Sequence, residues 1–543
     1  MSVTSDAPAS DESRGVPGGP GDTGRLSETS RARVFAVLTV IVLFTEVTPM
    51  QYTIVAAALQ KIAPSFPGVG ADINWSIIIF GLVGAVASPV IGKMSDVWGK
   101  KRMFLICGWL FVIGCLLCAV TSNWVVFLIG RGLQATAVAT TIIAYGLIRD
   151  LLPRKYIPLG LGITATGIGF AAVGGPLVGG FLVDSFSWRA VFWCLGGFSL
   201  LMMPVVVAVV PESALRVRDH IDMVGAALLS IGSCLVLIYL NKGQDWGWGR
   251  AATLAWLIGG IVLLALFFLV EMRSARPIMD MTLLFQPRVS LVLLAGLLAS
   301  FYNGVHSFAI AYMAQSPSAA TVSTGIQHAT LARIRQSGGP VLSPDAVAVS
   351  LNPAYTYGDG FTLLQFATHV QLIQAVLSMV FGAAAGALAR RLGARLPLVC
   401  ALALFTASAA CFALLSHSWV TFFWLNIAFG IGFGLYHASM PILMVEGVPQ
   451  EQQGISLGML GIMQSMGMAV GVAVVTAFLR AHPVTAEVTV DGHSPTTKLL
   501  AGVFSDSGYE LGFWFSAVTA LIALAIALIM RHGRTPATGG AAH

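Results

Sequence analysis

Residues 92 to 102 read Gly-Lys-Met-Ser-Asp-Val-Trp-Gly-Lys-Lys-Arg and lie between two long apolar stretches. They combine one acid, Asp96, with two glycines and four cations. Gly92 and Gly99 let two helix ends approach closely and the chain reverse, and Asp96 can sit at the positive N-terminus of a helix. Because cations beside membrane helices are retained on the cytoplasmic side, the stretch predicts a cytoplasmic hairpin between two transmembrane helices.

The composition excludes a soluble globular protein. The chain has 543 residues, of which 56% are hydrophobic and 10% charged, and its mean hydropathy is +0.83. No soluble core buries that much apolar surface, so a multi-pass protein of the cell membrane is predicted. Residues 1–33 are rich in Pro, Gly, Ser and charge and lack a signal-peptide pattern, which predicts a disordered cytoplasmic tail.

Fourteen apolar runs in the sequence are long enough, at about 20 residues, to cross a bilayer. With the N-terminus in the cytoplasm, 21 of the 30 Lys and Arg residues fall in inner segments and 8 in outer segments, while Arg131 lies within a helix. This bias supports the count of fourteen and places both termini in the cytoplasm. The net charge of +6 thus reflects membrane topology, and nucleic acid is not expected as a partner.

The glycine spacing of the hairpin recurs in the second half of the chain. Gly386, Arg390 and Gly393 repeat the spacing of Gly92, Asp96 and Gly99, with a cation in place of the acid. Two homologous bundles are therefore expected, in an all-α fold that exposes a central site alternately to each side. The predicted parts are a six-helix bundle at 34–210, two linker helices at 211–285, a second six-helix bundle at 286–530, and a cytoplasmic tail at 531–543.

Two outer segments, 315–361 and 480–509, are unusually long and rich in small and polar residues. A solvated or partly ordered loop is the favoured interpretation of each, ahead of a binding lid. The first contains residues 329–336, which can form a short helix, and two tyrosines that can anchor it at the membrane interface, Tyr355 and Tyr357.

The hairpin resembles the signature loop between helices 2 and 3 of the major facilitator superfamily. Val97 stands where that family usually has Arg, a departure that weakens a gate ion pair. The resemblance implies the major facilitator fold, with two six-helix bundles plus two linker helices, and a transport function. It also implies a conformational gate at Gly92, Asp96, Gly99, Lys100 and Arg102, repeated in the second half at Gly386, Arg390 and Gly393.

A second resemblance lies in predicted helix 5, which carries the order Gly-Pro-x-x-Gly-Gly. The residues are Gly175, Pro176, Gly179 and Gly180. They resemble the antiporter motif of exporters in this superfamily, which is generally missing from its importers. Generic small-residue packing explains the glycines but not their order with the proline. The motif therefore favours export.

Two ionisable residues at membrane depth are the candidates for proton coupling. The segment with Arg131 and Gln134 resembles the helix 4 motif implicated in proton coupling in the family, with Ala135 where Gly is usual. A structural Arg satisfied by carbonyls and Gln134 is the alternative. Glu46 lies near the middle of helix 1, where low dielectric disfavours its charged form, so it can take up and release a proton. A permanently protonated or Arg-paired structural Glu is the alternative. In the fourteen-helix drug:proton antiporters, which helix 1 resembles, Asp normally stands at Gln51, so Glu46 is the proposed replacement.

Other polar and soft side chains at membrane depth suggest a partly hydrated, adaptable cavity wall, although each taken singly is more often structural. The candidates for the substrate cavity are Gln51, Gln134, Asn303, His306, His369, Gln374, Asn426, Phe433, Tyr436, His437, Met463 and Gln464. The histidines lack the spacing of a metal site, and the seven cysteines are expected to be apolar packers.

The leading hypothesis is export of amphipathic small molecules or drugs by a monomer, driven by the proton gradient, with protons and the bilayer as its other partners. No cofactor is expected, since the sequence has no nucleotide-binding motif. An exporter of a lipid, an endogenous metabolite or an antibiotic is the alternative. A membrane-embedded enzyme or receptor is disfavoured, because the short loops carry no catalytic cluster.

Overall fold

The computed structural model describes residues 26, 30–67, 75–214, 223–273, 284–338, 340–449, 452–490 and 496–537. Most of the predicted disordered tail, 1–33, lies outside these ranges. The first helix begins at Arg31, three residues before the predicted span. Ser30 caps it, with its hydroxyl accepting a hydrogen bond from the Arg33 amide at 3.4 Å.

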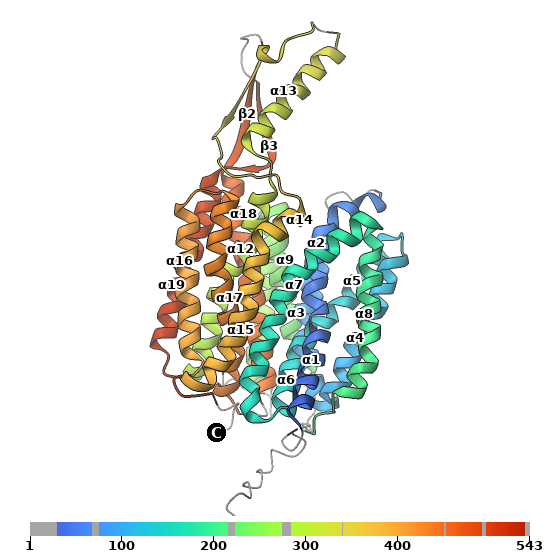
Figure 1. Ribbon diagram of the computed structural model, residues 1–543, viewed down its shortest axis with the longest axis vertical. Helices are drawn as coiled ribbons and strands as arrows, with labels where there is room; N and C mark the ends of the chain where they lie inside the picture. Colours follow the sequence, from blue (N-terminus) through green and yellow to red (C-terminus); the bar gives the residue numbers. More distant parts are fainter. Residues whose placement is uncertain are drawn as a thin grey trace, which may run out of the picture.

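The first bundle consists of six helical rods (Figure 1). Two of them are interrupted: α1 and α2 meet at Glu46, and α5 and α6 are joined by a 3-10 turn, Thr136–Val138. The helices are α1 (Arg31–Thr45), α2 (Val47–Ile62), α3 (Trp75–Trp98), α4 (Lys100–Val120), α5 (Trp124–Ala135), α6 (Ala139–Leu151), α7 (Ile157–Ser185) and α8 (Trp188–Val209).

The two linker helices are α9 (Met223–Trp246) and α10 (Ala251–Arg273), which pack on each other, while α9 also contacts α3 and α18. The second bundle follows. Its helices are α12 (Pro287–Gln315), α14 (Leu363–Phe366), which continues through a π-helical turn, Ala367–Gln371, into α15 (Leu372–Leu392), α16 (Arg395–Leu414), α17 (Trp419–Gly447), α18 (Gln453–Ala481) and α19 (Asp506–Ile529).

Eleven helical spans among the described residues are long and apolar enough to cross a membrane. Helices α3, α7 and α9, with 24, 29 and 24 residues, are also of membrane-spanning length. The described part of the chain thus holds enough helices for the fourteen predicted crossings. The start of α1 and the end of α19 lie at the same end of the molecule (Figure 1).

The predicted hairpin and its repeat have the same backbone geometry. Gly99, between α3 and α4, has φ +106°, and Gly393, between α15 and α16, has φ +85°. A side chain is strained at such angles, which explains why glycine stands at the reversal in both halves. This shared turn is structural support for the internal repeat.

A small ordered cap covers one end of the second bundle, where the sequence predicted two loops. Helix α13 (Ala319–Gln336) packs on strand β1 (Val347–Asn352), which pairs with β2 (Pro483–Val490), and β2 pairs with β3 (Thr496–Phe504). All pairings are antiparallel, in the order β1-β2-β3, with Val347 opposite Val490 and Asn352 opposite Thr485. The cap lies at the end opposite the start of α1 and the end of α19 (Figure 1). The predicted all-α class holds in that the described chain is mostly helical, and these three strands are an addition to it.

The two tyrosines in the first loop do not lie at an exposed membrane interface. Tyr355 and Tyr357 are 4% and 2% exposed. The Tyr357 hydroxyl donates a hydrogen bond to the carbonyl of Phe504 at 2.7 Å and accepts one from its amide at 3.1 Å. The Tyr357 ring also contacts the ring of Tyr509 on α19, with centroids 5.1 Å apart, so this buried tyrosine joins the cap to the bundle, which corrects the prediction of an interfacial anchor.

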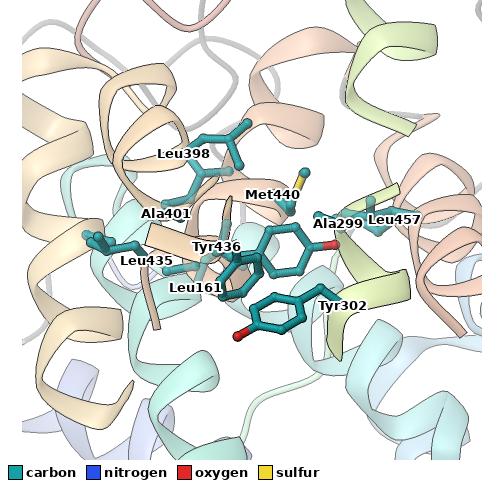
Figure 2. Packing of buried hydrophobic residues seen from close by; sticks show 14 of the residues in the cluster. Leu161, Ala299, Tyr302, Leu398, Ala401, Leu435, Tyr436, Met440 and Leu457 are labelled. Carbon is teal, nitrogen blue, oxygen red and sulfur yellow. The ribbon is translucent and has the colours of Figure 1, made fainter. Parts of the chain in front are cut away.

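The two bundles meet along α7, which contacts α15 and α17. Figure 2 shows Leu161 of α7 among the buried residues of the second bundle, near Tyr436 and Leu435 of α17. Helix α7 also packs on α2, so it lies between the interrupted first rod and the opposite bundle.

Candidate functional site

A buried hydrogen-bond network joins the first and fourth rods of the first bundle. Arg131, fully buried, donates through Nε to the Ser76 carbonyl at 3.0 Å and through Nη1 to Gln134 Oε1 at 2.9 Å. The same Gln134 oxygen accepts from Gln51 Nε2 at 2.6 Å. The guanidinium also lies over the Phe80 ring, 4.9 Å from its centroid. A carbonyl, a side-chain amide and an aromatic ring thus hold this cation inside the bundle. The arrangement agrees with the alternative prediction for Arg131, a structural Arg satisfied by carbonyls and Gln134.

Glu46 lies at the junction of α1 and α2 and is 6% exposed. Its amide still donates to Val42 and its carbonyl accepts from Met50, so the backbone bonding continues through the junction. Its Oε2 atom is buried and has no hydrogen-bond partner among the described residues. An ionised carboxylate in that place would lack compensation, so burial favours the protonated form. Glu46 is therefore a buried carboxyl without a hydrogen-bond partner for Oε2 among the described residues.

The hairpin carries a buried ion-pair cluster. The cluster lies at the same end of the first bundle as the start of α1. Lys100 Nζ lies 2.7 Å from Asp96 Oδ1 and 3.1 Å from Asp150 Oδ2, and Arg149 Nε lies 2.5 Å from Asp150 Oδ1. All four groups are at most 8% exposed. Asp96, predicted to sit on a helix N-terminus, thus lies one turn before Lys100 and binds its side chain. The cluster joins the α3–α4 hairpin to α6.

Glu212 supplies the capping acid that the sequence prediction assigned to Asp96. Its carboxylate oxygens accept hydrogen bonds from the amides of Lys101 at 2.9 Å and Arg102 at 3.2 Å, in the first turn of α4. A carboxylate there satisfies free amides and complements the positive helix end. Glu212 follows α8, more than a hundred residues along the chain, so no local pattern could reveal the contact.

The glycines of the proposed antiporter motif occupy different environments on α7. A Cβ built on Gly179 would lie 2.8 Å from the Cγ2 atom of Ile54 on α2, closer than real contacts allow. A Cβ on Gly180 would meet nothing within 4 Å. Gly175 is buried, and Pro176 lies within the continuous helix. Gly179 therefore permits the close approach of α7 to α2, the rod that begins next to Glu46.

The gate glycines of the second half lie at the contact between bundles and beneath the C-terminal segment. A Cβ on Gly386 would collide with the carbonyl oxygen of Pro158, at the start of α7. The Gly393 turn is covered by residues 533–535, and the Arg395 amide donates to the Gly533 carbonyl at 3.0 Å. Arg390, near the end of α15, is half-buried. Residues 531–537 are thus packed against the ends of α15 and α16.

Several predicted cavity residues are buried inside a bundle. Gln51, Gln134 and Asn426 are fully buried, Asn303 is 1% exposed and His306 is 3% exposed. His306 Nε2 lies 2.8 Å from Asn426 Oδ1, and its ring stacks on Phe429 with centroids 3.5 Å apart. The Gln51–Gln134 and His306–Asn426 bonds connect helices within each half, whereas both polar atoms of the Asn303 side chain lack a hydrogen-bond partner among the described residues.

A second group of predicted cavity residues is partly exposed and surrounds a buried tyrosine. Tyr436 donates to the Gly296 carbonyl at 2.9 Å and accepts from Gln464 Nε2 at 3.1 Å. Phe433 and His437 lie one turn apart on α17, with ring centroids 4.2 Å apart. The half-buried members of the group are Gln374, Phe433, His437, Met463 and Gln464.

His369 lies apart from both groups. It is exposed in the π-helical turn before α15, and its ring contacts Phe361 and Trp419 at the end of the bundle next to the cap. The structure therefore does not bring His369 together with His306 or His437.

The sequence reasoning missed Asp150, Arg149, Glu212 and Cys115, of which Cys115 accepts a hydrogen bond from Gln134 at 3.1 Å. Arg149 and Asp150 follow the long apolar run of α6, and an adjacent cation and acid at that place are a detectable signal. The partners that they find come from the tertiary fold.

The comparison with protein families decides the classification. The model of the Major Facilitator Superfamily matches residues 39–340 and again residues 292–542. The chain belongs to the Major Facilitator Superfamily. The major facilitator assignment from the sequence is confirmed, and the enzyme and receptor alternative loses its support.

Relatives in the superfamily include transporters from bacteria. The chain is 30% identical to the uncharacterized MFS-type transporter YvkA of Bacillus subtilis over 47% of this chain and 56% of that protein. It is 27% identical to a probable actinorhodin transporter of Streptomyces coelicolor, over 89% of this chain and 79% of the relative. It is 24% identical to the multidrug resistance protein Stp of Mycobacterium tuberculosis, over 79% and 72%. The match thus spans little more than half the length of YvkA.

Solved major facilitator structures share the fold. The human organic anion transporter MFSD10 aligns with a TM-score of 0.58 at 13% identity, over 91% of this chain and 99% of its own. The proton:xylose symporter XylE aligns with a TM-score of 0.55 at 14% identity, over 94% and 99%. At these identities the likeness shows the fold alone, so direction and substrate require arguments from this chain's residues.

Proposed function

We propose that this major facilitator protein exports amphipathic small molecules across the cell membrane in exchange for protons, as a monomer with both termini in the cytoplasm. The observation that carries the proposal is the buried Glu46 carboxyl, whose Oε2 atom has no hydrogen-bond partner among the described residues. The bias of Lys and Arg toward the predicted inner segments supports the orientation.

The proton step follows from the setting of Glu46. In the described conformation burial favours the neutral carboxyl, so the residue carries a proton. When the bundles rock, water reaches the α1–α2 junction from the cytoplasmic side. The water stabilises the charged carboxylate of Glu46, and the proton leaves. Proton entry into the cell and substrate exit are then coupled, because the protonated carrier brings the proton inward and the substrate-bound carrier takes the substrate outward.

The substrate is proposed to contact α17. Phe433 and His437 lie on one face of this helix and are half-buried, whereas the faces beside them are packed. Gly430 and Gly434 touch α15, and Tyr436 is bonded to α12 and α18. An aromatic ring and an imidazole, with the half-buried Met463 on the neighbouring helix α18, suit an amphipathic molecule better than a sugar or an inorganic ion.

The direction of transport is supported by the glycine and proline order on α7 and by the names of relatives. Stp is named a multidrug resistance protein, which agrees with export of foreign compounds. The second candidate function is export of an endogenous product. It is favoured by the probable actinorhodin transporter, which aligns over 89% of this chain.

The test uses inverted membrane vesicles with an acidic interior and a panel of fluorescent cationic and neutral amphiphiles. We expect uptake by the wild type that collapses when the pH gradient is removed, and no gradient-driven uptake by Glu46→Gln. Glu487→Gln, the same change in the cap, should leave uptake unchanged. Gradient-driven uptake that survives Glu46→Gln would refute the assigned role of Glu46. Transport of actinorhodin but not of the amphiphile panel would favour the second function.

A further inference from the structure

The internal repeat extends to the first and fourth helices of each half. Residues 124–127 read Trp-Val-Val-Phe and begin α5, while residues 419–422 read Trp-Val-Thr-Phe and begin α17. Counting seven residues on from each tryptophan reaches Arg131 in the first half and Asn426 in the second. Asn426 therefore stands at the position of Arg131.

The first helices align in the same way. Residues 33–38 of α1 share Arg-Val-x-x-Val-Leu with residues 288–293 of α12. Eighteen residues after each arginine stand Gln51 in the first half and His306 in the second. The burial agrees, because Val34 and Val289 are 2% and 1% exposed and Val37 and Val292 are both fully buried. His306 therefore stands at the position of Gln51.

Both halves use these positions to join the first helix to the fourth. In the first bundle Gln51 reaches Gln134, which also binds Arg131. In the second bundle His306 binds Asn426 directly, at 2.8 Å. These two pairs of equivalent positions thus hold equivalent helices together, although the residue types differ.

The difference between the halves is charge. Arg131 is a permanent cation. His306 and Asn426 are surrounded by aromatic rings: Phe429 stacks on the imidazole with ring planes 9° apart, and Phe412 lies edge-on at 5.6 Å. Among the described residues His306 forms no ion pair, so none of them compensates a charge on the imidazole.

We infer that His306 and Asn426 are a neutral positioning pair, the second-bundle counterpart of the Arg131 network. The pair keeps α12 against α17 while the bundle moves as a unit, and it takes no part in proton transfer. This inference rests on the proposed alternating-access function. Proton coupling therefore does not run through His306.

The alternative is that His306 is a second proton carrier. Titratable groups on the described helices packed around it include Tyr302 and Tyr312 of α12, Cys411 of α16, Tyr436 and His437 of α17, Tyr509 and Glu510 of α19 and, at the helix ends, His417 and Asp506. Tyr302 bonds Ser408 at 2.9 Å, and His417 and Asp506 bind each other at 3.1 Å. Each of these bonds is made away from His306, so no proton path between it and an acid is formed by the described residues. This arrangement favours the neutral pair.

The test compares His306→Gln, which installs the residue that the first bundle uses at this position, with His306→Leu and Asn426→Leu. Gln retains a hydrogen bond to Asn426, so His306→Gln should keep wild-type KM, kcat and pH profile in vesicle transport. His306→Leu leaves a buried amide unpaired and should lower kcat about tenfold, with KM changed less than about twofold. Asn426→Leu should match His306→Leu.

Two results would overturn the inference. A changed pH profile or proton-to-substrate ratio in His306→Gln would make His306 a proton carrier. Wild-type kcat in His306→Leu would remove the positioning role. If the wild type itself shows no gradient-driven transport, the proposed export function fails instead. Unfolding midpoints in detergent then test the pair directly. The midpoint of His306→Leu should lie below that of the wild type, and the midpoint of His306→Gln should equal it. Equal midpoints for the two variants would refute the pair.

Discussion

Gly162 of α7 and Gly386 of α15 bring the two bundles into backbone contact. A Cβ built on Gly162 would lie 3.2 Å from the Gly386 Cα atom and 2.7 Å from the carbonyl oxygen of Gly382. No side chain fits between the helices at this point. A contact of this kind can form and break during rocking without repacking of side chains, which suits a gate between moving bundles.

The first prediction concerns this contact. Gly386→Ala should lower transport and destabilise the protein by about 1–3 kcal/mol, because the new methyl collides with the Pro158 carbonyl and separates α7 from α15. Vesicle transport and thermal unfolding in detergent measure the effect. Gly461→Ala on α18, where a Cβ meets nothing within 4 Å, is the control and should be neutral or slightly stabilising. Equal behaviour of the two variants would contradict the packing argument.

The second prediction separates the two adjacent glycines of the α7 motif. Gly179→Ala should impair transport, since its methyl would press on the stiff, β-branched Ile54 side chain of α2. Gly180→Ala should transport like the wild type, because that position faces open space. Initial uptake rates at matched expression are the measurement. A stronger defect in Gly180→Ala would show that the motif works through sequence-specific contacts other than helix packing.

The third prediction concerns the ion pair between Lys100 and Asp150. Asp150→Asn should cost about 3–5 kcal/mol of stability, because it leaves the buried Lys100 and Arg149 charges with one fewer acid. The unfolding midpoint in detergent measures the loss, and Asp345→Asn, in the turn before β1, should show none. A double-mutant cycle with Lys100→Met isolates the pair. Zero coupling energy in that cycle would mean that the two side chains contribute independently.

The fourth prediction concerns the attachment of the cap. Burial raises the pKa of Tyr357 to about 12, so its hydroxyl stays a hydrogen-bond donor at physiological pH. Tyr357→Phe removes both bonds to Phe504, at about 0.5–1.5 kcal/mol each. Hydrogen exchange of residues 496–504 should then quicken. Tyr355→Phe, which removes one bond to Pro317, should have a smaller effect. Unchanged exchange in Tyr357→Phe would show that packing alone holds the cap.

The sequence predicted the site best where a residue's own chemistry constrains its environment. Arg131 was singled out because a cation at membrane depth needs partners, and the structure supplies Ser76 and Gln134. Glu46 was singled out for the same reason, and its carboxyl is indeed buried. Their roles in coupling stay predictions. His369 was grouped with the other histidines by depth alone, and it lies exposed at the end of the helix because depth does not fix the direction of a side chain.

By itself the sequence determined the class of protein, the membrane helices, the repeated hairpin and the glycines at its turns. Apolar length, charge bias and the conformational freedom of glycine are properties of short segments, so they can be identified without a fold. Only the tertiary structure decided that Glu212 caps α4, that Asp150 completes the Lys100 cluster, and that three strands from two distant loops form one sheet. Each of these depends on partners far apart in the chain, which meet only when apolar burial has packed the helices together.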